Sequence, residues 1–97
     1  MRPRKKKEKV DLEALKSAFM RVPHMPVRVA RYLLDIGYTE IYELPGLSPE
    51  LLFDKILARD FLAERDAVLP ALRLAVYFAE NKDSADRALL DLNAWKD

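Results

Sequence analysis

The stretch RVPHMPVRVA, residues 21–30, decides the fold, because it places Pro23 and Pro26 between two apolar patterns of helical spacing. Pro23 is expected to end the first helix, since a proline disfavours helical geometry at the residue before it. Pro26 suits the first turn of the next helix, where a missing N–H donor costs little. The sequence therefore predicts two helices that meet at a tight corner.

The residues on either side of the corner predict where each helix begins and ends. Asp11 is a plausible N-cap of the first helix. The buried face of that helix is expected to consist of Leu12, Leu15, Phe19 and Val22. The apolar stripe of the second helix consists of Val29, Ala30, Leu33 and Ile36. Gly37 then stands where a left-handed C-cap is needed.

The second half of the chain also has helical periodicity. Thr39 is predicted to cap a short helix, and Ser48 followed by Pro49 opens a longer one. The buried side of that longer helix is expected to be Leu51, Leu52, Ile56 and Leu57. We expect a last helix, opened by Asp83 or Ser84, to return Trp95 to the body of the protein.

The stretch ERDAVLPALRLAVYFAE, residues 64–80, predicts the long central helix. Its broad apolar stripe consists of Val68, Leu69, Leu72, Ala75, Val76 and Ala79. Pro70 is tolerated in an early turn if Asp66 is the cap, and otherwise a kink is expected. Tyr77 and Phe78 are adjacent and point in different directions, so one of them is available for a partner helix or for Trp95.

Length and composition set the fold class. The 97 residues predict one domain. Only two glycines are present, which argues against a β-sandwich or barrel with its many tight turns. We therefore expect an all-α domain over residues 11–97, with five or six short helices built around a helix-hairpin-helix-like (SAM-like) unit at residues 11–44.

The charge is concentrated at the N-terminus. The net charge is +1, but residues 1–9 hold six basic side chains against Glu8, which leaves a mildly acidic body. Residues 1–10 are therefore predicted to be a disordered basic arm. Such an arm attracts phosphates without sequence preference, and Lys5, Lys6 and Lys7 are its candidate contacts. The alternative is a solvated tail with no specific role.

Several classes of function are excluded. The chain has no cysteine, and its single histidine, His24, has no neighbouring carboxylates with which to build a metal site. No phosphate loop, dinucleotide fingerprint or activated serine occurs. We therefore expect no enzyme activity, metal, cofactor or small-molecule substrate. No apolar run is long enough to span a membrane, the basic start is not a signal peptide, and a cytoplasmic location is expected.

The corner resembles the helix-hairpin-helix motif, whose pattern is apolar-Pro-Gly-apolar-Gly followed by Ala, Leu and Gly at fixed offsets. The residues that match this pattern are Val22, Pro23, Met25, Ala30, Leu33, Gly37 and Leu44. His24 and Pro26 stand where the motif has its two hairpin glycines. The structural residues that this resemblance implies are Pro23, Pro26, Ala30, Leu33 and Gly37.

Residues 15–97 resemble a family of small bacterial proteins known as the pathogenicity-locus family. LSPELLFDKI is similar to the segment that follows the hairpin there, LRLAVYFAE to the last long helix, and WKD to the C-terminus. The chain departs from that family in having a single tryptophan, Trp95, and no cysteine in the long helix. The resemblance implies a fold and leaves the activity open.

In DNA-binding helix-hairpin-helix proteins, the glycines let backbone N–H groups approach a phosphate of any duplex. His24 obstructs that approach and Pro26 removes a donor. Basic side chains around the turn offer a replacement: Arg21, His24, Arg28 and Arg31. The leading interpretation is a non-enzymatic module that binds duplex DNA through phosphates. The alternative is a protein-interaction or homo-oligomerisation module in which the hairpin is purely structural.

Overall fold

The computed structural model describes residues 11–97, in which there are helices and turns but no strand. The α-helices of this region are α1 (Leu12–Leu15), α2 (Val27–Asp35), α3 (Pro49–Arg59) and α4 (Arg65–Glu80). The 3-10 helices are η2 (Ala18–Arg21), η3 (Ile41–Glu43), η4 (Arg87–Leu89) and η5 (Leu92–Trp95). The all-α class is confirmed, although residues 11–97 form four α-helices where five or six helices were expected.

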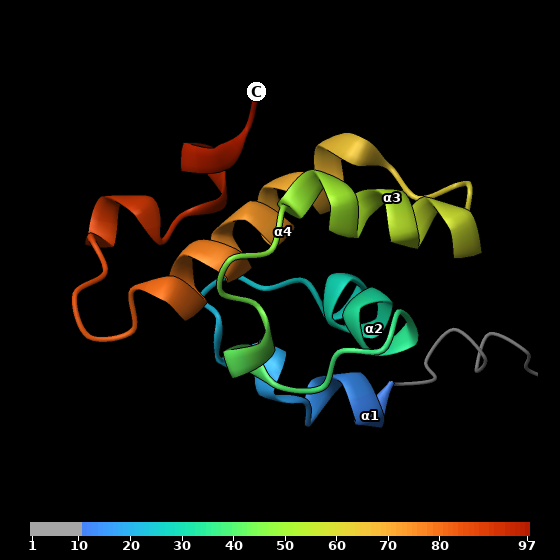
Figure 1. Cartoon of the computed structure of the whole chain (residues 1–97), viewed down its shortest axis with the longest axis horizontal. Coiled ribbons are helices and arrows are strands. Elements are labelled where there is room, and N and C mark those ends of the chain that lie inside the picture. Colours follow the sequence, from blue (N-terminus) through green and yellow to red (C-terminus); the bar gives the residue numbers. More distant parts are fainter. Residues whose placement is uncertain (1–10) are drawn as a thin grey trace, which may run out of the picture.

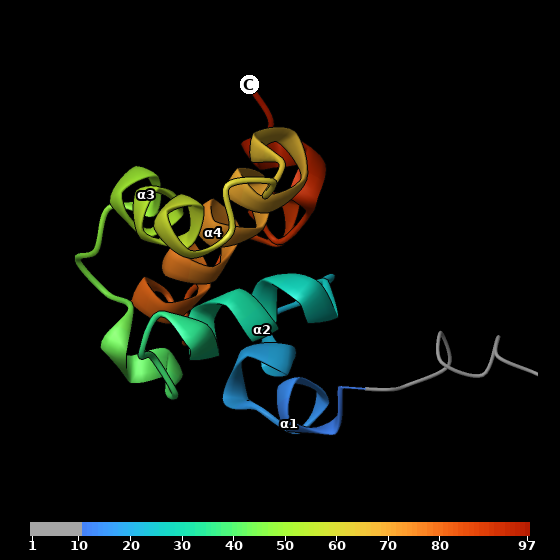
Figure 2. The ribbon, with the colours of Figure 1, turned by 90° about the vertical axis from the view of Figure 1, so that its right-hand side faces the viewer.

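Helix α4 is the centre of the fold. It packs beside α3, and α2 lies below this pair with α1 on its outer side (Figures 1 and 2). The chain after α4 folds back so that η5 contacts α4. Every apolar position predicted for the central helix is buried: Val68, Leu69, Leu72, Ala75, Val76 and Ala79. The prediction of a central helix is confirmed.

Pro70 lies inside α4 and does not end it. The helix begins at Arg65 with Glu64 as its N-cap, so Asp66 is the second helical residue and not the cap considered from the sequence. Pro70 is the sixth residue of the helix, in its second turn. Pro70 lacks the N–H that would donate to the carbonyl of Asp66, four residues earlier. Because Asp66 is exposed, water can satisfy that carbonyl, and the proline is tolerated near the helix start.

The first helix is shorter than predicted. Asp11 caps it as expected by accepting a hydrogen bond from the Ala14 N–H at 3.1 Å. The helix ends at Leu15, the backbone of Ser17 is extended, and the Ser17 hydroxyl donates to the Ala14 carbonyl at 2.7 Å. The predicted continuous face is therefore wrong. Leu12 and Leu15 are 59% and 40% exposed, whereas Phe19 and Val22, after the break, are buried.

Helix α2 follows its predicted pattern. Val29, Ala30 and Leu33 are buried, and Ile36 is half-buried at the end of the stripe. Gly37 has a positive φ of 104°. Its N–H donates to the Leu34 carbonyl at 3.1 Å, and the N–H of the next residue, Tyr38, donates to the Leu33 carbonyl at 3.0 Å. These two bonds are those of a Schellman cap, which explains the glycine.

The start of α3 is confirmed, but one of its buried positions is wrong. The Ser48 hydroxyl accepts a hydrogen bond from the Leu51 N–H at 3.3 Å, and Pro49 is the first helical residue. Leu51 is nevertheless 61% exposed, while Phe53 is buried. The buried face of α3 therefore consists of Leu52, Phe53 and Ile56 and is rotated toward Phe53 relative to the prediction.

The short helix predicted after Thr39 is a single 3-10 turn, Ile41–Glu43. Its N-cap is Glu40 and not the predicted Thr39, whose backbone N–H donates to the Glu43 carboxylate at 2.8 Å. The same carboxylate oxygen accepts from the Glu40 N–H at 2.9 Å. These two backbone donors lower the pKa of Glu43.

The predicted last helix is replaced by two 3-10 turns. Asp86 and Asp91 cap η4 and η5, in place of the predicted Asp83 or Ser84. The return of the tail is confirmed, since the ring of Trp95 lies 5.5 Å from that of Tyr77. The Trp95 indole N–H donates to the Leu89 carbonyl at 2.8 Å, which ties η5 to η4.

The sequence pattern places both Leu12 and Leu33 on buried faces, but only Leu33 is buried in the structure. We therefore expect the two alanine substitutions to lower the free energy of unfolding by unequal amounts. Leu33→Ala should lower the free energy of unfolding by about 2–5 kcal/mol, because it empties a fully buried site. Leu12→Ala, the matched control, should change it by less than about 0.5 kcal/mol. Chemical denaturation followed by circular dichroism measures both values. Comparable losses for the two variants would contradict the observed end of α1.

Candidate nucleic-acid interface

The corner between η2 and α2 is built on two buried anchors. Val22 and Met25 are buried on either side of exposed His24, and the Met25 N–H donates to the Val22 carbonyl at 3.2 Å. His24 has a positive φ of 62°. This is one of the two positions where the helix-hairpin-helix pattern that the sequence resembles has a glycine. The backbone thus adopts a left-handed conformation there although the side chain is not glycine.

The start of α2 leaves backbone donors at the corner. Pro26 is the N-cap, and its carbonyl accepts hydrogen bonds from the N–H groups of Val29 and Ala30 at 3.0 and 3.2 Å. The N–H groups of Val27 and Arg28 precede this first closed turn and have no partner within the helix. They lie at the positive end of the helix dipole, which favours an anion.

Three of the four predicted basic residues lie close to these donors in the sequence. Arg21 is the last residue of η2, His24 is at the tip of the turn, and Arg28 is in the first turn of α2. All three are exposed. Within residues 11–97 none of them forms an ion pair. The charges of Arg21 and Arg28 are therefore not offset by ion pairs in this part of the chain.

Arg31 is in a different environment. Its guanidinium contacts three carboxylates, those of Asp11 at 3.3 Å, Glu13 at 2.9 Å and Asp35 at 3.0 Å. The hydrogen bond with Glu13 is the largest of the effects that raise the pKa of Arg31. The structure therefore directs Arg31 toward the N-cap of α1 and separates it from the other three basic residues.

The remaining predicted residues have structural positions or lie outside the described part of the chain. Ala30 and Leu33 are buried under the corner, and Pro23 and Pro26 are half-buried. Gly37 caps α2 as described above. Lys5, Lys6 and Lys7 lie outside residues 11–97.

Residues 11–97 lack the arrangements typical of a metal site or a membrane-spanning helix. No group of three or more histidine or acidic side chains in residues 11–97 is arranged to hold a metal ion. None of the helices described there has the length and apolar character needed to cross a bilayer.

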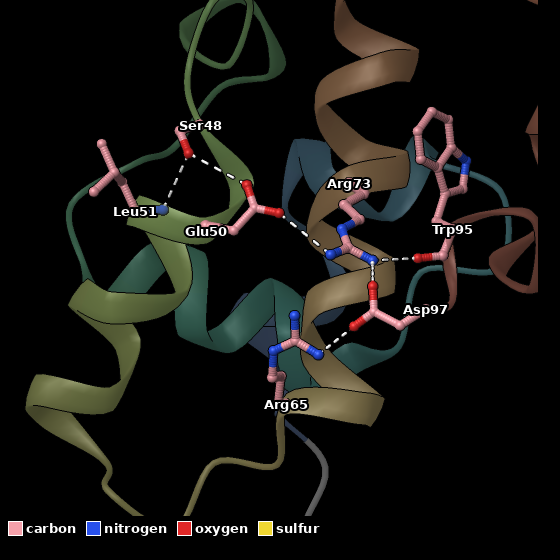
Figure 3. Close-up of polar contacts among 7 residues, drawn as sticks. All are labelled: Ser48, Glu50, Leu51, Arg65, Arg73, Trp95 and Asp97. Atoms are coloured by element: carbon pink, nitrogen blue, oxygen red, sulfur yellow. Dashed lines mark hydrogen bonds and ion pairs between the residues drawn. The ribbon is translucent and has the colours of Figure 1, made fainter.

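A second charged cluster joins the tail to α4 (Figure 3). One oxygen of the Asp97 side chain accepts a hydrogen bond from Arg73 at 2.8 Å, and the other contacts Arg65. Arg73 also donates to the Trp95 carbonyl at 2.6 Å and to Glu50 of α3 at 3.3 Å. Arg73 thus links α3, α4 and the tail.

The cluster of Arg65, Arg73 and Asp97 was not predicted from the sequence. Arg65 and Arg73 are eight residues apart, about two helical turns, so they share one face of α4. That spacing was the available signal. Asp97 lies 24 residues beyond Arg73, and only the two 3-10 turns of the tail return it to the pair.

Comparisons with protein-family models, with curated proteins and with solved structures found no match. The resemblance to the pathogenicity-locus family therefore stays a prediction from the residues.

The left-handed backbone at residue 24 predicts which substitutions the corner tolerates. His24→Val should lower the free energy of unfolding by about 1–2 kcal/mol, because a β-branched residue is poorly suited to positive φ. His24→Asn should change it by less than about 0.5 kcal/mol, because asparagine tolerates this conformation. The exposed side chain contributes little packing, so the comparison reports on the backbone. Equal stability of the two variants in denaturant titrations would contradict a left-handed residue 24.

The Asp97 contacts predict an acid-dependent contribution to stability. Hydrogen bonds from Arg65 and then Arg73 lower the pKa of the Asp97 carboxyl below its ordinary value of 3.8. The ionised Asp97 carboxyl therefore contributes its full stabilisation of the folded protein above pH 3.8, its ordinary pKa. This contribution is lost as the pH falls through the lower pKa that Asp97 has in the folded state. The difference in unfolding free energy between the wild type and Asp97→Asn should be constant near neutral pH and shrink below 3.8. A difference that does not change with pH would contradict this assignment.

Proposed function

We propose that the protein is a small, non-enzymatic, helix-hairpin-helix-like module that binds duplex DNA without sequence preference. The contact surface is the corner at residues 21–28, assisted by the basic arm of residues 1–10. The duplex phosphates are the groups it recognises, because phosphate contacts fix position without reading bases. A cytoplasmic location belongs to the same proposal.

The observation that carries the proposal is the combination of open backbone donors and unpaired cations at one corner. The N–H groups of Val27 and Arg28 lie at the start of α2, and the side chains of Arg21, at the end of η2, and Arg28, in the first turn of α2, are exposed. Backbone donors at a helix start and nearby arginines are the two kinds of group that hold phosphate oxygens. The buried anchors Val22 and Met25 keep the two kinds together.

The corner compensates for the glycines it lacks. The positive φ at His24 retains the backbone course that a glycine would allow, and the histidine side chain points outward as a further polar contact. Pro26 contributes no donor, so the arginine side chains supply more of the binding here than in a glycine-containing hairpin. We therefore expect weak binding with strong salt dependence.

A second candidate function is supported by exposed apolar residues away from the corner. Phe61 and Leu62, in the turn between α3 and α4, are each 77% exposed. Leu51, on α3, is 61% exposed. Large apolar side chains in such positions are typical of surfaces that contact another protein. In this interpretation the corner is structural and the module binds a partner or a second copy of itself.

Salt dependence separates the two candidates. A labelled 20-bp duplex (about two helical turns) should bind the wild type at about 50 mM salt and lose affinity steeply at about 200 mM. Arg21→Gln/Arg28→Gln should lower the slope of log affinity against log salt by about 2, one for each phosphate contact. Lys82→Gln/Arg87→Gln removes the same charge after α4 and should leave the slope nearly unchanged. Fluorescence anisotropy measures all three proteins.

The other outcomes are equally informative. Replacing Lys5, Lys6 and Lys7 together by Gln measures how much the basic arm contributes to the affinity for DNA. Absence of binding at about 50 mM salt, or equal losses in the two double variants, would exclude the corner as a phosphate site. In that case sedimentation that shows concentration-dependent self-association would favour the second candidate.

A further inference from the structure

We propose that Arg65 and Arg73 form a carboxylate-binding site that the chain fills with its own Asp97. The partner is an acidic peptide segment of another protein, which enters by displacing the tail, residues 82–97. This site lies on α4 and the tail and shares no residue with the proposed DNA surface, so either proposal can fail alone.

The two arginines present a preformed receptor for one carboxylate. They share a face of α4, and each holds a different oxygen of the Asp97 side chain (Figure 3). Arg73 is held by Glu50 of α3 and by two groups of the tail, the Trp95 carbonyl and Asp97. The contact with Glu50 remains when the tail leaves, and a side chain that is partly restrained loses less conformational freedom when a ligand binds. Glu50 therefore keeps Arg73 oriented toward the site when one carboxylate replaces another.

The charges around the pair favour a single carboxylate over a polyanion. Glu50 contacts Arg73, and Asp66 lines the cavity beside Arg65. These two carboxylates offset two of the three cations around the site, Arg65, Arg73 and Lys96, which leaves too little excess positive charge to attract a row of phosphates. The positions of the two guanidinium groups, rather than the net charge of the surface, therefore select the ligand. The Asp97 side chain shows how one carboxylate fits between them.

A cavity gives an incoming residue room beside the bound carboxylate. It has a volume of about 300 Å³ and is lined by Arg65, Asp66, Pro70, Lys96 and Asp97. Because it opens next to the contact between Arg65 and Asp97, a competing carboxylate can reach Arg65 before the tail has left. Displacement can then proceed by exchange of one carboxylate for another.

The tail is held to the core by half-buried rather than fully buried side chains. The fully buried apolar residues of the described chain end at Ala79, and the apolar residues of the tail that pack against the core, Leu90, Leu92 and Trp95, are only half-buried. The bond from the Trp95 indole to the Leu89 carbonyl lies within the tail. Segments with few buried contacts open at a lower free energy than the core. The tail is therefore the part of the described structure best suited to exchange.

The tail also indicates the kind of peptide that fits. Trp95 packs on Tyr77, and Asp97 reaches the arginines two residues later. A ligand with an aromatic residue followed at the second position by Asp or Glu reproduces both contacts. An acidic peptide of this pattern is the predicted partner.

The test uses the full chain carrying Asp97→Asn, which removes the internal carboxylate and keeps both arginines. The probe is a dye-labelled peptide, Leu-Asn-Ala-Phe-Lys-Asp, with an amidated C-terminus so that the Asp side chain is its only carboxylate, and fluorescence anisotropy measures its binding. We expect it to bind Asp97→Asn about tenfold more tightly than the wild type, because charged hydrogen bonds of the competing residue are lost. A peptide ending in Asn should bind at least tenfold more weakly.

Two controls keep the result specific. Adding Arg65→Gln to Asp97→Asn should abolish the preference for the acidic peptide, and the unchanged emission of Trp95 should show that the tail region is intact. Inorganic phosphate should displace the peptide no better than chloride at equal ionic strength. The proposal is overturned if the Asp and Asn peptides bind equally, if Arg65→Gln has no effect, if phosphate displaces the peptide preferentially, or if no binding occurs.

Discussion

The corner at residues 22–25 is the constraint on which the arrangement of the first two helical segments depends. Val22 and Met25 are both buried while His24 between them is exposed, so the chain has to turn sharply within a few residues. The left-handed conformation of His24 costs about 1–2 kcal/mol. Burial of each apolar anchor contributes about 1.5–3 kcal/mol, so the two anchors together outweigh that cost. This explains how the corner is stable without its glycines.

The corner also determines how the basic residues are distributed. It places α2 so that Arg21 and Arg28 face solvent near the helix start, while Arg31, one turn further along, meets the acidic start of α1. Four basic residues that are close in sequence thus divide into an unpaired group and a neutralised one. The phosphate interpretation rests on the first group alone.

Sequence reasoning predicted the long helices well and the ends of the chain less well. α2 and α4 have apolar stripes that persist over two turns or more, so periodicity identified their buried faces. Leu12 and Leu15 fit the same period but lie before a break at Ser17, and a period cannot show where hydrogen bonding stops. The pairing of Asp97 with Arg65 and Arg73 depends on tertiary folding of the tail, which no local pattern encodes.

The corner and the tail cluster are thus separate surfaces on one helical core, and the backbone of residue 24 is the feature that the account depends on most. Solution NMR measures it directly through the intraresidue cross-peak between the amide and α protons of His24. A positive φ brings these protons close, so the account predicts a cross-peak markedly stronger than those of residues within α2. A weak cross-peak, with helical values running unbroken from η2 into α2, would contradict the corner and the phosphate surface built on it.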